Sequence, residues 1–193
     1  MTKGRLEAFS DGVLAIIITI MVLELKVPHE PNPEALLELW PVFSSYVLSF
    51  IYLGIYWYNH HHLFHAVQHV RGGVLWANLH LLFWLSIVPF VTGWMGENHF
   101  ARWPVFFYGV VLLCCAMAFT ILVRFLLAAN GPDSLLAKAV GNDWKGNISL
   151  AIYVVALGLN FIHPLLSIAC YVAVAMIWFI PDRRIERVLP TKP

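Results

Sequence analysis

The stretch RLEAFSDGVLAIIITIMVL, from Arg5 to Leu23, joins a charged and hydroxylated segment directly to a long apolar run. Counted from Leu6 to Leu25, the segment has the length of about 20 residues that a helix needs to cross a bilayer. Ser10 and Asp11 lie just inside it, where an ionisable residue is costly and is usually kept for function. We therefore expect a membrane-spanning helix whose first turns carry functional side chains.

The composition places the rest of the chain in a membrane as well. Of the 193 residues, 60% are hydrophobic and only 12% are charged, and the mean hydropathy is +0.74. A soluble domain of this length needs more charges to cover its surface, so the excess apolar side chains are expected to face the lipid bilayer. The net charge of +1 gives no broad basic surface, so no nucleic acid is expected as a partner.

Six apolar segments predict an all-α integral membrane protein with six transmembrane helices in a single domain, residues 1–193. The expected spans are 6–25, 41–64, 74–95, 103–128, 148–162 and 165–180. A loop rich in proline and glutamate follows the first span, and one amphipathic turn is expected at 135–140. The last two runs are short for spans, but Pro164 disfavours one continuous helix between them.

Lysine and arginine fix the orientation. With six spans and the N-terminus inside, only Lys26 and Arg102 fall on the outer side. The other ten fall on the cytoplasmic side: Lys3, Arg5, Arg71, Arg124, Lys138, Lys145, Arg183, Arg184, Arg187 and Lys192. This bias predicts that both the N- and the C-terminus are cytoplasmic.

The first helix has one aliphatic edge. At about 100° per residue, a single stripe contains Ile16, Ile20 and Leu23. Thr19 lies roughly 60° from this stripe, and Asp11 lies roughly 140° from Ile16. Two interpretations stay open: the stripe faces lipid or another helix, or it repeats around a symmetry axis and lines a narrow pore. The preceding polar residues favour the second, because they need partners that would fix the rotation of the helix.

Arg5, the tripeptide Phe9-Ser10-Asp11 and the aliphatic run after them resemble the signature of the transmembrane protein 175 family. This family comprises the lysosomal potassium channel and its prokaryotic homologues. No Thr-Val-Gly-Tyr-Gly-like potassium filter is present. The animal channel has two six-span repeats, each with its own motif. With one motif, this chain is similar to the prokaryotic form, a homotetramer expected in the plasma (inner) membrane.

The resemblance implies a pore surrounded by four copies of the first helix. Its narrowest site would be Ile16, with Ile20 and Leu23 one and two turns further out, and Thr19 corresponds to a threonine linked to selectivity. A ring of isoleucines has no oxygen ligands, so it would act as a hydrophobic gate that favours potassium, the more easily dehydrated cation. Monovalent cations would permeate, potassium foremost, and neither a resident cofactor nor a metal site is implied.

The same resemblance assigns a helix-bracing motif to Arg5, Phe9, Ser10 and Asp11. The second helix ends at the cytoplasmic face where the first begins, so side chains there are expected to bond Ser10 or Asp11. The candidate partners are His60, His61, Asn78 and His80. The sequence leaves open which histidine takes part; its protonation would alter the brace and tune opening with pH.

The histidines at the end of the second span support an alternative. His61, His65 and His69 follow at i, i+4 spacing, and such residues can hold zinc or ligate haem. The alternative function is therefore a proton- or metal-coupled secondary transporter that uses this His-rich end. No cysteine accompanies the cluster, and internal repeats and broken helices are not found. Hydrolase and metalloprotease motifs are also absent, so an enzyme is not expected.

Overall fold

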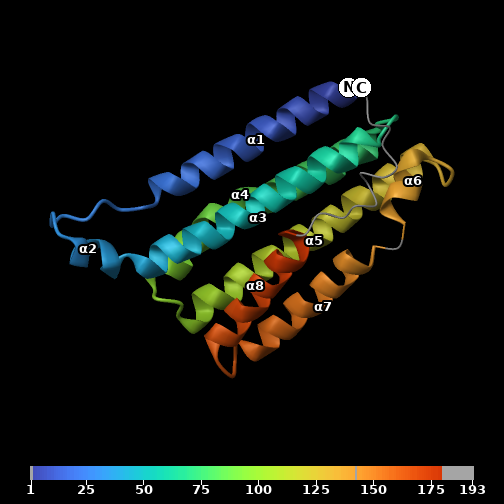
Figure 1. Cartoon of the computed structure of the whole chain (residues 1–193). Helices are drawn as coiled ribbons and strands as arrows, with labels where there is room; N and C mark the ends of the chain where they lie inside the picture. Colours follow the sequence, from blue (N-terminus) through green and yellow to red (C-terminus); the bar gives the residue numbers. More distant parts are fainter. Residues whose placement is uncertain (1, 142, 180–193) are drawn as a thin grey trace.

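The chain forms a bundle of helices, which the computed structural model describes for residues 2–141 and 143–179 (Figure 1). Six helices run along the bundle, and two short ones, α2 and α6, lie in its connections. In order they are α1 (Lys3–Leu23), α2 (Pro33–Glu38), α3 (Trp40–His65), α4 (Gly72–Glu97), α5 (Arg102–Asn130), α6 (Leu135–Val140), α7 (Trp144–Leu159) and α8 (Pro164–Phe179).

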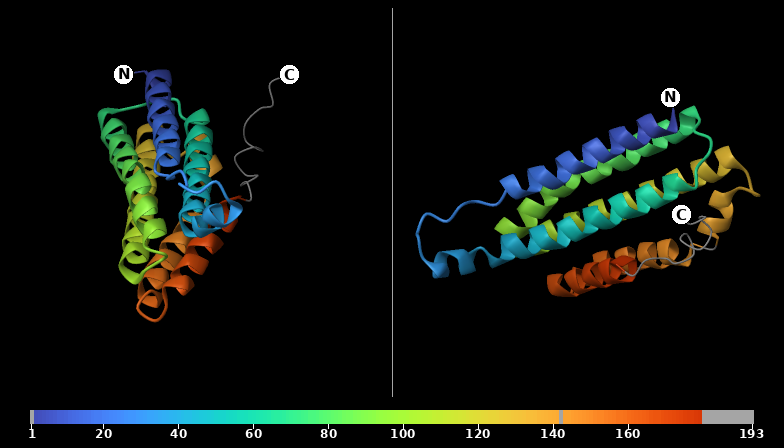
Figure 2. Two further views of the ribbon diagram at one scale, coloured as in Figure 1. Left: turned by 90° about the vertical axis from the view of Figure 1, so that its left-hand side faces the viewer. Right: turned by 45° about the horizontal axis from the view of Figure 1, so that its top comes forward.

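The helices are not equally surrounded. α3, α4 and α5 form the centre, and α7 and α8 pack against α5 on one side of it (Figure 1). α1 lies at the opposite edge, where it packs on α3 and α4 (Figure 2). One side of the first helix therefore has no partner within the described part of the subunit.

Three helices are long and apolar enough to cross a membrane by length and composition: α1, α4 and α5. α3 is also 26 residues long, but its last turns are rich in tyrosine and histidine. α7 and α8 are apolar with 16 residues each. Each predicted span coincides with one helix apart from its ends. α1 ends at Leu23 and α7 at Leu159, earlier than expected, and position 180 lies outside the described residues.

The two connecting helices differ in how well the sequence predicted them. α6 coincides with the amphipathic turn expected at 135–140, and Ser134 caps it by accepting the N–H of Ala137. α2 lies in what was expected to be only a loop. Its start carries a recognisable signal, because Asn32 accepts the N–H of Ala35 and Pro33 follows as the first helical residue.

Polar contacts at the two ends of the bundle agree with successive spans that run in alternating directions. At one end, Lys3 Nζ donates to the main-chain oxygen of His65 at 3.5 Å. At the other, Lys26 forms an ion pair with Glu97. The expected cytoplasmic C-terminus lies outside the described residues, together with the cations Arg183, Arg184, Arg187 and Lys192.

Close packing of α4 on α3 depends on Gly96, because a Cβ there would lie 2.7 Å from the Cα of Val42. We expect Gly96→Ala to lower the free energy of unfolding by about 1–3 kcal/mol, since the two backbones must separate. Gly54→Ala in α3 is the matched control, because a Cβ there meets nothing within 4 Å. Thermal unfolding in detergent checks this, and equal midpoints for the two variants would contradict it.

Candidate functional site: the exposed face of α1

One face of α1 is buried against the rest of the bundle. It consists of Leu6, Ser10, Leu14, Ile17 and Met21, which recur every three or four residues. This apolar seam packs on α3 and α4. It therefore fixes which residues of α1 point away from the subunit.

The predicted stripe lies on the opposite, exposed side. Ile16 is 58% exposed and Leu23 is 79% exposed, and Phe9 and Ile20 are exposed with them. Thr19 is exposed too, and its Oγ1 donates to main-chain oxygens of the preceding turn at 3.0 and 2.9 Å. The threonine hydroxyl thus bonds its own helix, beside an aliphatic surface that no other described helix covers.

A buried chain of hydrogen bonds joins α1, α3 and α4 through Ser10. Asn78 Nδ2 donates to Ser10 Oγ at 2.9 Å, and Asn78 Oδ1 lies 2.8 Å from His60 Nε2. Ser10 in turn donates to the main-chain oxygen of Leu6 at 2.9 Å. Asn78 and Ser10 are completely buried, and His60 nearly so. The structure thus brings two predicted partners, His60 and Asn78, to Ser10.

Asp11 takes a different partner, which the sequence reasoning missed. Trp57 Nε1 donates to Asp11 Oδ1 at 3.1 Å. His61 does not bond the carboxylate but stacks on the Trp57 ring, with centroids 6.1 Å apart. The available signal was the position of Trp57 one turn before His61, because its indole N–H can only donate and so suits a carboxylate.

Four residues predicted for the network lie outside it: Phe9, which is exposed on the aliphatic side of α1, His61, Arg5 and His80. Arg5 is exposed, and its side chain forms no hydrogen bond or ion pair with any described residue. The reason is its place roughly 20° from Ile16 around α1, on the side facing away from α3 and α4. His80 lies roughly 200° around α4 from Asn78. It is exposed and accepts a hydrogen bond from Trp84 Nε1 at 2.9 Å.

Two hollows flank α1. A groove of about 840 Å³ between α1 and α4 is lined by Ile16 and Ile20 and, at its outer end, by Glu24. A smaller cleft of about 420 Å³ on the α3 side contains Asp11 and His61. The exposed side of the first helix therefore borders an apolar groove, and its polar motif borders the histidines.

The histidine cluster is smaller than the spacing predicted. The rings of His61 and His65 lie 5.1 Å apart, but α3 ends at His65, so the prediction that His69 shares their helical face was wrong. Beyond the helix, the chain follows a different course, in which Asn130 Oδ1 accepts the N–H of Gln68 and of His69. Within residues 2–141 and 143–179, no group of three or more His, Cys, Asp or Glu could hold a metal ion.

Known proteins are similar to this chain in sequence and in fold. The family model described as the endosomal/lysosomal potassium channel TMEM175 matches residues 5–89, which contain the whole Ser10 network. The chain is also 54% identical over 189 residues to a potassium channel of Chryseobacterium sp. (strain P1-3), and the alignment covers 98% of both proteins. This chain belongs to the TMEM175 family.

Other TMEM175 proteins extend the comparison. A potassium channel of Chamaesiphon minutus is 35% identical, over 88% of this chain and 90% of the relative. The crystal structure of a lysosomal potassium-selective channel TMEM175 homolog from the same organism matches with a TM-score of 0.81 at 32% identity. That match covers 92% of this chain and 96% of the other. The protein is therefore an all-α integral membrane protein of the TMEM175 fold, with close bacterial relatives.

Proposed function

We propose that this protein is a potassium channel, a homotetramer of six-span subunits whose α1 helices line the pore. Its membership in the TMEM175 family supports conduction of potassium, because its bacterial relatives are named as potassium channels. The pore assignment rests on one observation. The aliphatic side of α1, with Ile16 at its middle, is exposed while the opposite side is locked into the subunit.

The composition of that exposed side favours a pore axis over lipid. Thr19 shares it with the aliphatic residues within the span, and Arg5 lies on the same side just before the span begins. A charged or hydroxylated side chain within a span usually faces a bundle interior or a water-filled cavity rather than lipid. The Ser10 and Asp11 bonds brace this orientation from the cytoplasmic end. We infer that four such helices bring their Ile16 side chains together around the axis.

A constriction of this kind selects ions by dehydration. Isoleucine offers no oxygen ligand, so a potassium ion crosses the ring by giving up part of its water shell, and sodium holds its water more tightly. Ile20 and Leu23 extend the apolar constriction outward, and Thr19 supplies a hydroxyl group beside it. This mechanism requires no resident metal or cofactor; potassium is the permeant ion, and the cell membrane of a prokaryote is its proposed location.

The first test is ion flux from proteoliposomes that contain the purified protein. Under a potassium gradient alone, we expect passive efflux that exceeds the efflux under an equal sodium gradient. Liposomes without protein are the control. Flux that requires a proton or metal gradient would contradict the channel and would favour the transporter based on His61 and His65.

A further inference from the structure

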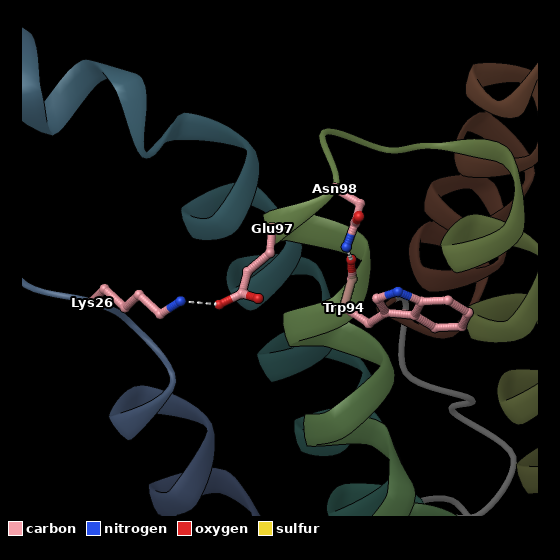
Figure 3. A network of polar contacts seen from close by, with 4 residues as sticks. All are labelled: Lys26, Trp94, Glu97 and Asn98. Atoms are coloured by element: carbon pink, nitrogen blue, oxygen red, sulfur yellow. Dashed lines mark hydrogen bonds and ion pairs between the residues drawn. The ribbon is translucent and has the colours of Figure 1, made fainter.

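Three charged side chains gather at the outer end of the groove between α1 and α4. Glu24 follows the last turn of α1, and Glu97 is the last residue of α4. Both line the groove that also contains Ile16 and Ile20. Lys26 reaches across from the loop after α1, and its Nζ lies 2.6 Å from Oε1 of Glu97 (Figure 3). The charges therefore border the same hollow as the proposed constriction.

Lys26 supplies a cation that α4 itself lacks. The last turn of α4 has no basic residue, and the Asn98 side chain donates to the main-chain oxygen of Trp94 at 2.8 Å (Figure 3). A positive charge is favourable at this negative end of the helix dipole. The hydrogen bond and the charge of Glu97 raise the pKa of Lys26 above its usual value, and Glu24 adds to this. The ammonium group thus stays charged in neutral solution.

The exposure of the pair decides what it can do. The side chains of Lys26 and Glu97 are 77% and 47% exposed, and ion pairs on such a surface contribute little to stability. As a clamp between α1 and α4 the pair is therefore weak. Its charges still act on dissolved ions, because the field of an exposed charge extends over about 10 Å at 0.1 M salt. We therefore expect these charges to affect the entry of ions more than they affect the packing of α1 against α4.

We propose that Lys26 determines the conductance of the outer mouth by neutralising Glu97, so that Glu24 alone attracts cations to each groove. This rests on the proposed function of α1 as the pore helix. Glu24 has no ion-pair partner among the described residues. Without Lys26, the net negative charge of the three residues doubles; without Glu97, it vanishes. Surface charge near a narrow entrance changes the local concentration of counter-ions and hence the rate of their entry.

Inward potassium current through the reconstituted full-length protein tests the proposal. At about 0.01 M KCl, where charges are screened over about 30 Å, we expect Lys26→Gln to raise the current about two- to threefold. Glu97→Gln is expected to lower it by a similar factor. The double variant Lys26→Gln/Glu97→Gln keeps the wild-type net charge and is expected to conduct like wild type. At about 1 M KCl all four proteins are expected to converge.

The pattern separates charge from structure. If the pair acted as a clamp, both single variants would change the current in the same direction and the double variant would not recover, which would overturn the proposal. Arg102→Gln is the matched control: Arg102 is an exposed cation at the same end of the bundle that does not line the groove, so its loss is expected to raise the current less than Lys26→Gln does. A wild-type protein without potassium current would instead overturn the proposed function and, with it, this inference.

Discussion

Replacing Ile16 with asparagine is expected to raise the potassium current roughly tenfold and to bring the sodium current close to it. In the proposed tetramer four asparagine amides would replace an apolar ring, so water and partly hydrated ions would remain in the constriction. Lowering the barrier to permeation by about 1.4 kcal/mol is enough for a tenfold increase in rate. The preference for potassium falls because sodium no longer has to shed its tighter water shell there.

The measurement is the current of reconstituted protein with potassium on one side and sodium on the other. Val22→Asn is the matched control, since Val22 is also an exposed aliphatic residue of α1. It lies roughly 120° around the helix from Ile16, away from the stripe. We expect a current and a reversal potential close to wild type for this variant. Equal effects of the two substitutions, or none from Ile16→Asn, would move the constriction to another position.

Replacing Asn78 with leucine is expected to cause the largest loss of stability, about 2–4 kcal/mol. The substitution removes the hydrogen bonds to Ser10 and His60 at once and leaves both polar groups buried without these partners. Each unsatisfied group costs about 1–3 kcal/mol. Single interhelical bonds in membranes contribute about 0.6 kcal/mol on average, which keeps the total near the lower end. α1 also loses its brace, so the potassium current should fall.

Thermal unfolding in detergent, followed by circular dichroism, measures this loss. His80→Asn is the control, because His80 lies on the same helix but is exposed and bonds only Trp84. Its midpoint is expected to match wild type. Ser10→Ala removes one of the two bonds of Asn78, so its unfolding midpoint is expected to lie between those of Asn78→Leu and His80→Asn. A midpoint for Asn78→Leu equal to that of His80→Asn would show that the buried network does not stabilise the fold.

The course of the helices follows from local pattern and chain chemistry. In lipid, every backbone polar group must bond within its own segment, so apolar runs of sufficient length become helices and their positions can be read directly. The stripe containing Ile16 and Ile20 follows in the same way, from the helical repeat alone. The ends and caps of helices are harder to predict. The helix after Asn32 was missed although its capping signal is present. The end of α1 was placed after Leu23, because no local signal marks its last turn.

The sequence by itself therefore determined the six long helices, the motif at Ser10 and Asp11, and the stripe of Ile16, Ile20 and Leu23 on α1. Only the tertiary structure decided which partners meet: Trp57 for Asp11, Asn78 for Ser10, and Lys26 for Glu97. The physical reason is that a helical repeat fixes directions within one helix, whereas a contact between helices depends on their relative rotation and register. Those are set by the packing of all neighbouring side chains together.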